Sequence, residues 1–330
     1  RNAVLIKNLS EIGKKKVREV KSVIEDEVLY PLVRGKNHKK WYIGTSAYII
    51  VPLDKDNKII KSSSLKVNFP KTYGYFTNFF DGLIKRGGQP YKSKLRLYLK
   101  ESLEKAEREA PPFYWLFNVK RVSAPYKVMW KEIAGKISGK GVFSAAVASP
   151  RDDKHIGEKP IVPDHKLMFI PLSDKDEAYY VAAVLNSSIA QAIVSGYTIE
   201  TTMDTHIAKH VLIPKFDSTN HRHQKLSRVS QKAHQLARKY YEQNDLLAQE
   251  ELREIEQKID KNVAELYGIN EDKLKEIKKA LKILQGKFDE IEEEIERVEK
   301  VFPTAEPVEV KAKDTVIQSN RPFVATFSIR

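Results

Sequence analysis

The strongest constraint on this chain is an apolar residue at every third or fourth position after Asp217. The spacing continues to Val298 with charged residues between, which is typical of amphipathic helices. Polar or glycine-containing breaks interrupt it at 243–244, 268–270 and 285–286, so three or four helices are predicted rather than one long coil. We therefore expect residues 218–302 to form an α-helical hairpin or bundle that acts as a spacer.

The preceding residues, 29–217, show a different pattern, with short strand-like runs punctuated by proline and glycine. A helix is predicted at 174–195, where Ser173 and Asp176 have the spacing of a capping box, and weaker helical patterns cover 73–86 and 94–109. The runs predict strands at 47–52, 126–131, 142–148, 167–171 and 207–213. The predicted fold class is α+β, with a mixed α/β domain followed by helices.

The two ends of the chain lack a core of their own. Residues 1–28 indicate a connector, and because the chain begins at Arg1 and not at Met, we expect it to be a piece of a longer polypeptide. Residues 303–330 contain β-branched residues and prolines, which indicates a short β-like C-terminal extension. A small strand pair and the start of another module both remain open for it.

The positive charge is concentrated in one part of the sequence. The chain has 58 Lys+Arg and 44 Asp+Glu, a net charge of +14. Residues 1–220 carry all of it (37 − 23 = +14), residues 221–330 are balanced (21 − 21 = 0), and residues 31–140 alone reach 23 − 8 = +15. A localised basic surface indicates a polyanionic partner, most often nucleic acid. The charge-rich surface of a thermophilic protein would instead predict an even spread of both signs.

Composition excludes several other classes of function. The chain has no cysteine, which excludes disulfides, a cysteine nucleophile and a thiolate metal site. Its apolar runs are far shorter than the roughly 20 residues that cross a bilayer, and no signal-peptide pattern is present. We expect a cytoplasmic protein without a membrane partner.

Three motifs could indicate catalysis or metal binding, and each also has a simpler interpretation. The loop 135–141 has no Walker pattern, and its glycines and lysines fit close approach to a phosphodiester better than nucleotide binding. Asp164 and Lys166 resemble part of a metal-dependent nuclease, which would need a second acid such as Asp152 or Glu158. His221 and His223 lie two apart, a spacing that fits surface histidines at a helix start better than metal ligands.

Six segments occur in an order that resembles a known family. They are Tyr30–Lys36 running to Trp41, Phe69–Tyr73 with Phe79 and Arg86 behind it, Tyr126–Lys131 with the glycine–lysine loop, Val162–Lys166, Ala183–Ser187 and Ile213–Phe216. Together they resemble the C-terminal target-recognition region of adenine-specific DNA methyltransferases of restriction–modification systems, the type IIG-like class. The resemblance covers roughly residues 28–268. The order of recognition domain and helices is also similar to type I specificity subunits, whose helices act as spacers.

The resemblance implies that catalysis lies elsewhere. Methyltransferases of this class hold the flipped adenine with an Asn/Asp-Pro-Pro-Tyr/Phe loop and bind S-adenosylmethionine at a glycine-bearing turn. Here the corresponding tetrapeptide is Ala110–Phe113, with alanine at the position of the amide or carboxylate. We therefore expect no cofactor in this chain and S-adenosylmethionine in a catalytic domain, in the same parent chain or in a separate subunit.

The expected role is recognition of double-stranded DNA by loop lysines, base-reading cations and neighbouring aromatic rings. Arg151, with Lys154 and His155, is a further candidate for holding the DNA backbone. The residues that we expect to contact DNA are Lys36, Lys39, Lys40, Trp41, Lys71, Tyr73, Arg86, Arg121, Tyr126, Lys127, Lys131, Lys136, Lys140 and Lys166. The main alternative is a scaffold whose helices bind a protein partner while the basic face tethers it to DNA; the third is the nuclease.

Overall fold

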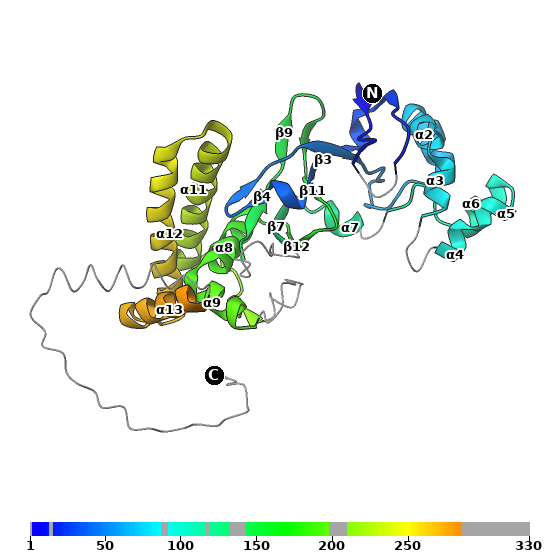
Figure 1. Ribbon diagram of the computed structural model, residues 1–330. Helices are drawn as coiled ribbons and strands as arrows, with labels where there is room; N and C mark the ends of the chain where they lie inside the picture. The colour runs from blue at the N-terminus through cyan, green and yellow to red at the C-terminus, as the bar shows by residue number, and fades with distance from the viewer. Residues whose placement is uncertain are drawn as a thin grey trace, which may run out of the picture. The chain divides into compact units, whose positions relative to one another are not determined.

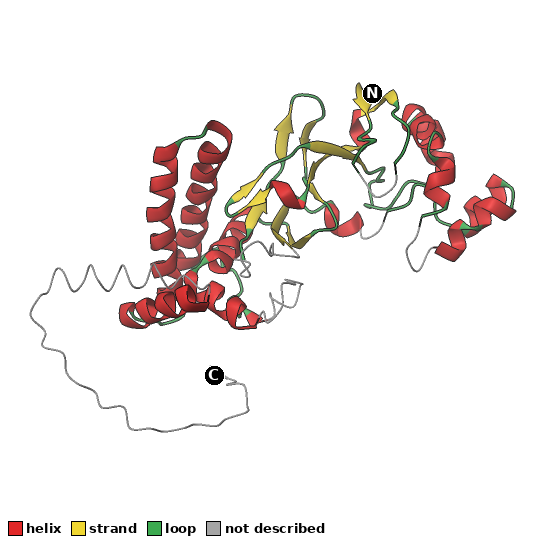
Figure 2. Cartoon of the chain, in the orientation of Figure 1, coloured by secondary structure: helices red, strands yellow, loops and turns green. Residues whose placement is uncertain are grey.

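The computed structural model describes residues 2–12, 16–86, 92–116, 119–131, 143–197 and 210–284 (Figures 1 and 2). Helices and several small sheets are both present, so the predicted α+β class is confirmed. The chain divides into two compact units, Arg1–Lys287 and Phe288–Arg330, and all of the described residues belong to the first. The predicted extension 303–330 lies outside the described residues.

The strands are short. Their bounds are β1 Ala3–Lys7, β2 Lys21–Glu25, β3 Leu29–Val33, β4 His38–Lys39, β5 Tyr42–Ile43, β6 Ala47–Ile50, β7 Tyr126–Lys131, β8 Ala146–Ala148, β9 Arg151–Asp153, β10 Gly157–Lys159, β11 Val162–Pro163 and β12 Leu167–Leu172. They form the sheets β1-β2, β10-β9, β11-β3-β6, β12-β7-β8 and β4-β5. All of the pairings are antiparallel except β11 with β3, which run parallel.

Strand β7 has the bounds that its β-branched and aromatic sequence predicts. It lies between β12 and β8, with Lys131 opposite Leu167 and Met129 opposite both Phe169 and Ala146. Val128, Met129 and Trp130 are all buried, because both faces of the strand are covered. A strand covered on both faces has a continuous apolar run instead of an alternating one.

The helices and 3₁₀ turns are distributed along the whole described chain. Their bounds are η1 Asp26–Val28, η2 Gly35–Asn37, α1 Ser62–Asn68, α2 Pro70–Thr77, α3 Phe80–Ile84, α4 Lys92–Leu95, α5 Leu97–Lys100, α6 Leu103–Glu109, α7 Val119–Val122, α8 Lys175–Asn186, α9 Ser188–Tyr197, α11 His221–Gln243, α12 Leu246–Leu266 and α13 Glu271–Leu284. The patterns predicted at 73–86 and 94–109 correspond to several short helices (Figure 1).

The N-terminal segment that we expected to be only a connector contains the hairpin β1–β2. Ile24 is completely buried, in an apolar cluster with Leu29 and Tyr75. The Glu25 carboxylate accepts hydrogen bonds from the backbone N–H groups of Lys71 and Thr72 at 3.1 and 2.9 Å. Because these groups begin helix α2, the carboxylate satisfies donors that a helix leaves unpaired at its start. The hairpin thus packs against the domain that follows it.

Two predictions in residues 174–213 are corrected. The helix is interrupted at Ser187, and its N-cap is Asp174, which accepts the N–H of Glu177 at 2.7 Å in place of the expected capping box. Residues 210–213 form no strand, and residues 207–209 lie outside the described part of the chain. At the end of α8, the Asn186 amide both donates to and accepts from the backbone of Ala145 at 2.8 Å. The side-chain amide thus makes the same two hydrogen bonds that a neighbouring strand would make. These bonds hold the end of α8 against the segment that leads into β8.

The predicted helical hairpin is formed by α11 and α12, which lie side by side (Figure 1). Asn244 connects them with a left-handed backbone, and Asp245 caps α12 by accepting the N–H of Ala248 at 3.0 Å. Buried residues of both helices belong to the same apolar cluster as Trp130 and Tyr180. The helices therefore share one core with residues of the segment 29–217, which a sequence pattern does not predict.

Among the described residues, no single helix has both the length and the apolar composition to cross a membrane. The bent pair α8 and α9, which meet at 61°, passes that test only when taken together, by length and composition.

Candidate nucleic-acid interface

Three segments far apart in the sequence bring lysines together at one end of two sheets. Strand β11 pairs in parallel with β3, so the turn that follows β11 lies beside η2, and the N–H of Asp164 donates to the carbonyl of Val33 at 2.9 Å. A Cβ placed on Gly35 would lie 3.5 Å from the Cβ of Lys166, which shows how closely the two turns approach. Leu167, next to Lys166, is opposite Lys131 at the end of β7.

We call Lys36, Lys39, Lys131 and Lys166 the lysine cluster. The side chains of Lys36, Lys39 and Lys166 are exposed, and Lys131 is partly buried. The pKa of Lys131 is lowered, first by burial and then by the positive charge of Lys39. The positive charge of Lys39 thus acts on Lys131, and an anion that binds near both gains from both charges.

The backbone that carries Lys36 and Lys39 is held rigidly. The N–H of Asn37 donates to the carbonyl of Arg34 at 2.8 Å, and the N–H of Gly44 donates to the carbonyl of Asn37 at 3.0 Å. The Asn37 side chain also accepts from the hydroxyl of Ser46 at 3.0 Å. Asn37 is therefore used inside the turn, which places the two lysines on a fixed support.

His38 joins this turn to the central sheet and was missed by the sequence reasoning. It is completely buried, and its Nε2 donates to the carbonyl of Met129 at 2.9 Å. Burial lowers its pKa to about 4, and the positive charges of Lys131 and Lys39 act in the same direction. The ring is therefore neutral at pH 7, and its hydrogen bond links β4, which carries Lys39, to β7, which carries Lys131. The only signal in the sequence was its place between two lysines.

Lys40 and Trp41 point to the helical hairpin and not to this cluster. Glu256 on α12 accepts from the Trp41 indole nitrogen at 2.7 Å and forms an ion pair with Lys40, also at 2.7 Å. Trp41 is 1% exposed and has a left-handed backbone with φ 62°. The prediction that Trp41 stacks on DNA is therefore wrong. Its ring is buried in the core, and its indole nitrogen is hydrogen-bonded within the protein.

Lys71, Tyr73 and Arg86 belong to the helical segment 62–109. Arg86 donates to the carbonyls of Leu83, Phe113 and Trp115 at 2.9–3.0 Å, and burial lowers the pKa of its guanidinium. Three of its five N–H donors therefore hold backbone carbonyls of this segment, which gives Arg86 a structural role, and base reading by Arg86 stays a prediction. Tyr73 packs edge-on against the buried ring of Phe113, while Lys71 is exposed at the start of α2.

Arg121, Tyr126 and Lys127 lie toward the other end of β7 from Lys131. Arg121 is exposed on α7 and Tyr126 is partly buried. Lys127 is completely buried, its ammonium donates to the carbonyl of Ala124, and burial lowers its pKa to about 7. The prediction that Lys127 reads bases is wrong, because its side chain has no exposed surface. Lys136 and Lys140, with the rest of the loop 135–141, lie outside the described residues.

The acidic residues of the nuclease alternative lie in two separate parts of the fold. The Asp164 carboxylate accepts the backbone N–H of Lys166 at 3.0 Å, within its own turn. Asp152 and Glu158 are opposite each other in the separate hairpin β9–β10. In the described residues, no group of three or more histidine or acidic side chains is arranged to hold a metal.

The two histidines at the start of α11 differ from the prediction. His221 is exposed, as expected, but His223 is 5% exposed. Its Nδ1 accepts the N–H of Asp217 at 3.0 Å, and its ring lies 4.7 Å from that of Tyr180. His223 therefore belongs to the core at the start of the hairpin.

The lysine cluster brings together positive charge from segments that are far apart in the sequence. No protein-family model and no curated protein sequence matches this chain.

Proposed function

We propose that this chain recognises a specific sequence in double-stranded DNA and is the specificity part of a restriction–modification adenine DNA methyltransferase. In this role it positions DNA for a catalytic domain that lies in the same parent chain or in a separate subunit. That domain supplies S-adenosylmethionine and the methyl transfer. The observation that carries the proposal is the lysine cluster, which three distant segments form and in which Lys36, Lys39 and Lys131 belong to the basic stretch 31–140.

The cluster has the chemistry of a phosphate-binding surface. Ammonium groups bind phosphates as point charges and release condensed counterions, which gives affinity and register but no sequence information. Sequence is read by side chains that reach base edges in a groove. Candidates for reading bases are Arg121, Tyr126 and the loop 135–141, which lies outside the described residues.

Ala110–Phe113 supports a role without catalysis of its own. The carbonyl of Pro111 accepts the hydroxyl of Tyr98 at 2.7 Å, and the ring of Phe113 is completely buried. These contacts build the tetrapeptide into the aromatic core of the segment 62–114. It therefore serves packing, and methylation requires residues from a partner domain.

Selection from a pool of randomised duplexes at near-physiological salt tests the proposal. We expect the retained fraction to be enriched in one short motif that contains adenine. The double variant Lys36→Gln/Lys166→Gln should bind every duplex more weakly and lower the slope of log K against log salt by about two. The matched control is Lys225→Gln/Lys258→Gln, which removes two exposed charges from the helices. An unenriched pool, or equal effects of both pairs, contradicts sequence recognition by this surface.

A scaffold role is favoured by one observation on the helical hairpin. Tyr241, Leu246 and Leu247, at the turn between α11 and α12, are 43%, 62% and 71% exposed. Neighbouring exposed apolar side chains are typical of protein-binding surfaces. In this alternative the turn binds a protein and the lysines tether the assembly to DNA without sequence preference. An unenriched pool with a steep salt dependence is its expected result.

A further inference from the structure

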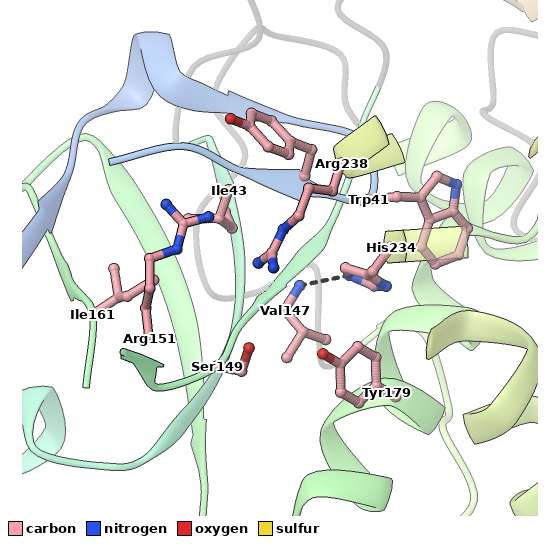
Figure 3. Close-up of a pocket in the computed structure, with 10 residues that line it drawn as sticks. Trp41, Ile43, Val147, Ser149, Arg151, Ile161, Tyr179, His234 and Arg238 are labelled. Carbon is pink, nitrogen blue, oxygen red and sulfur yellow. Dashed lines mark hydrogen bonds between the residues drawn. The ribbon is translucent and has the colours of Figure 1, made fainter. Parts of the chain in front are cut away.

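A small pocket lies between the recognition domain and helix α11 (Figure 3). Its walls come from Trp41–Ile43, from the segment after β8 and from α11. Arg151 and Arg238 both line it, although they are 87 positions apart in the sequence (238 − 151), and Figure 3 shows both guanidinium groups directed into the same space. The cavity measures about 30 Å³, which suits a group of a few atoms rather than a nucleotide.

The pocket has more hydrogen-bond donors than acceptors. A single carboxylate oxygen, Oε1 of Glu242, lies 3.2 Å from Arg151 Nη2, 3.3 Å from the hydroxyl of Tyr42 and 3.9 Å from Arg238 Nε. Charge-assisted hydrogen bonds normally measure about 2.7–2.9 Å. One oxygen is therefore shared among three donors at long distance, and two planar guanidinium groups bring five N–H donors each.

The remaining polar groups do not neutralise the two arginines. The hydroxyls of Ser149 and Tyr179 line the same wall and are uncharged. His234 donates from Nδ1 to the carbonyl of Ser230 at 2.8 Å, and its Nε2 accepts the N–H of Val147 at 2.9 Å. This pairing fixes a neutral imidazole. Two positive charges thus face one shared carboxylate that reaches in from a partly exposed position.

We propose that Arg151 and Arg238 form a binding site for a phosphate-type oxyanion, in which the anion takes the place now held by Glu242. Planar guanidinium groups match the oxygens of phosphate in pairs, which a lysine cannot do. The anion has two sources with this chemistry, a phosphodiester of DNA or free inorganic phosphate. The first source rests on the proposed function, and the second does not.

The first experiment measures thermal unfolding of the full chain in phosphate and in chloride at equal ionic strength. Phosphate also stabilises proteins generally, so the informative quantity is the difference between variants. We expect the phosphate-dependent rise in Tm to be larger by a few degrees for the original chain than for Arg238→Gln. Arg228→Gln removes an exposed arginine from the same helix and is the matched control. It should retain the full rise.

Glu242→Gln separates anion binding from a structural ion pair. If Glu242 occupies the anion position, this variant removes the competing charge and should enlarge the phosphate-dependent rise. Arg238→Gln acts in the opposite direction. If the three residues only hold α11 against β9, both variants lower Tm in chloride and neither changes the response to phosphate, which overturns the proposal.

Duplex DNA distinguishes the two sources. A DNA phosphate at this site predicts that Arg238→Gln lowers the slope of log K against log salt by about one, while Arg228→Gln leaves it unchanged. A phosphate effect on Tm with no change in the DNA slope assigns the site to free phosphate. The chain can fail to bind DNA and still show the phosphate effect, in which case the proposed function fails and this site remains. Loss of both effects refutes the site.

Discussion

The indole nitrogen of Trp41 donates a 2.7 Å hydrogen bond to Glu256, which lies 215 positions later in the chain. The same carboxylate pairs with Lys40, so a single residue of α12 holds two neighbours on the turn between β4 and β5. The turn is held from the other side by the N–H of Trp41, which donates to the carbonyl of Ala145 at 3.2 Å. These contacts maintain the left-handed backbone of Trp41, a conformation that costs about 1–3 kcal/mol in a non-glycine residue.

Glu256→Ala should destabilise the protein by about 1–3 kcal/mol, because it leaves a buried indole N–H without an acceptor. Urea unfolding followed by tryptophan fluorescence measures the effect. Glu254→Ala, an exposed glutamate on the same helix, is the matched control and should change stability by less than about 0.5 kcal/mol. Equal midpoints for the two variants would show that the contact contributes nothing.

Stability should fall as the pH is lowered from about 6.5 to 4. Burial is the main cause that lowers the pKa of His38 and of His234 to about 4, and nearby cations, Lys131 and Lys39 for the first and Arg238 for the second, add to it. The unfolded chain binds protons first, near pH 6.5, so the stabilisation is complete above that pH and is lost toward pH 4. Each lowered pKa corresponds to at most about 3.4 kcal/mol of stability.

Urea midpoints between pH 7.5 and 4.5 measure this loss. His38→Gln and His234→Gln each retain one hydrogen-bonding group but do not titrate, so each should flatten the pH dependence by about half. His155→Gln, an exposed histidine, is the control and should leave the curve unchanged. A pH dependence that persists in the double variant His38→Gln/His234→Gln would assign it to other groups.

We expect Asp260 on α12 to stabilise the packing of α12 against α9 and α13. Its carboxylate accepts from the N–H and from the hydroxyl of Ser188, both at 2.7 Å, and pairs with Lys278 at 2.8 Å. Asp260→Asn keeps the shape and removes the charge, and we expect a loss of about 1–3 kcal/mol in urea unfolding. Asp272→Asn, an exposed aspartate on α13, serves as the control. An unchanged midpoint for Asp260→Asn would contradict this role.

Lys127→Met should raise stability at pH 7. Burial lowers the pKa of Lys127 to about 7, so the unfolded state binds the additional proton and the cost grows as the pH falls from about 10.5 toward 7. Methionine has a similar volume without the charge, and the gain should be about 1 kcal/mol or more. DNA affinity should not change, because the side chain has no exposed surface. A selective loss of DNA binding in this variant would show that Lys127 contacts DNA.

Local sequence patterns determined the elements that have strong periodicity. The run Tyr126–Lys131 predicted β7 with its observed bounds, and the three- and four-residue spacing after Asp217 predicted α11, α12 and α13 with the breaks at 243–244 and 268–270. Such patterns depend on neighbouring residues alone, since a strand repeats every two residues and a helix every 3.6. The charge distribution likewise followed from counting.

Tertiary packing alone decided which cations are exposed and which are neighbours. Lys127 and Lys131 belong to the same strand, yet one is enclosed and the other reaches the lysine cluster, because different elements cover the two ends of β7. Gly35, next to Lys36, approaches Lys166 only through the parallel pairing of β3 with β11, about 130 residues later. Trp41 is buried because α12 supplies an acceptor from 215 positions away. The sequence by itself determined the elements and the charge of this protein. Its burial and its long-range contacts depend on pairings that no local pattern encodes.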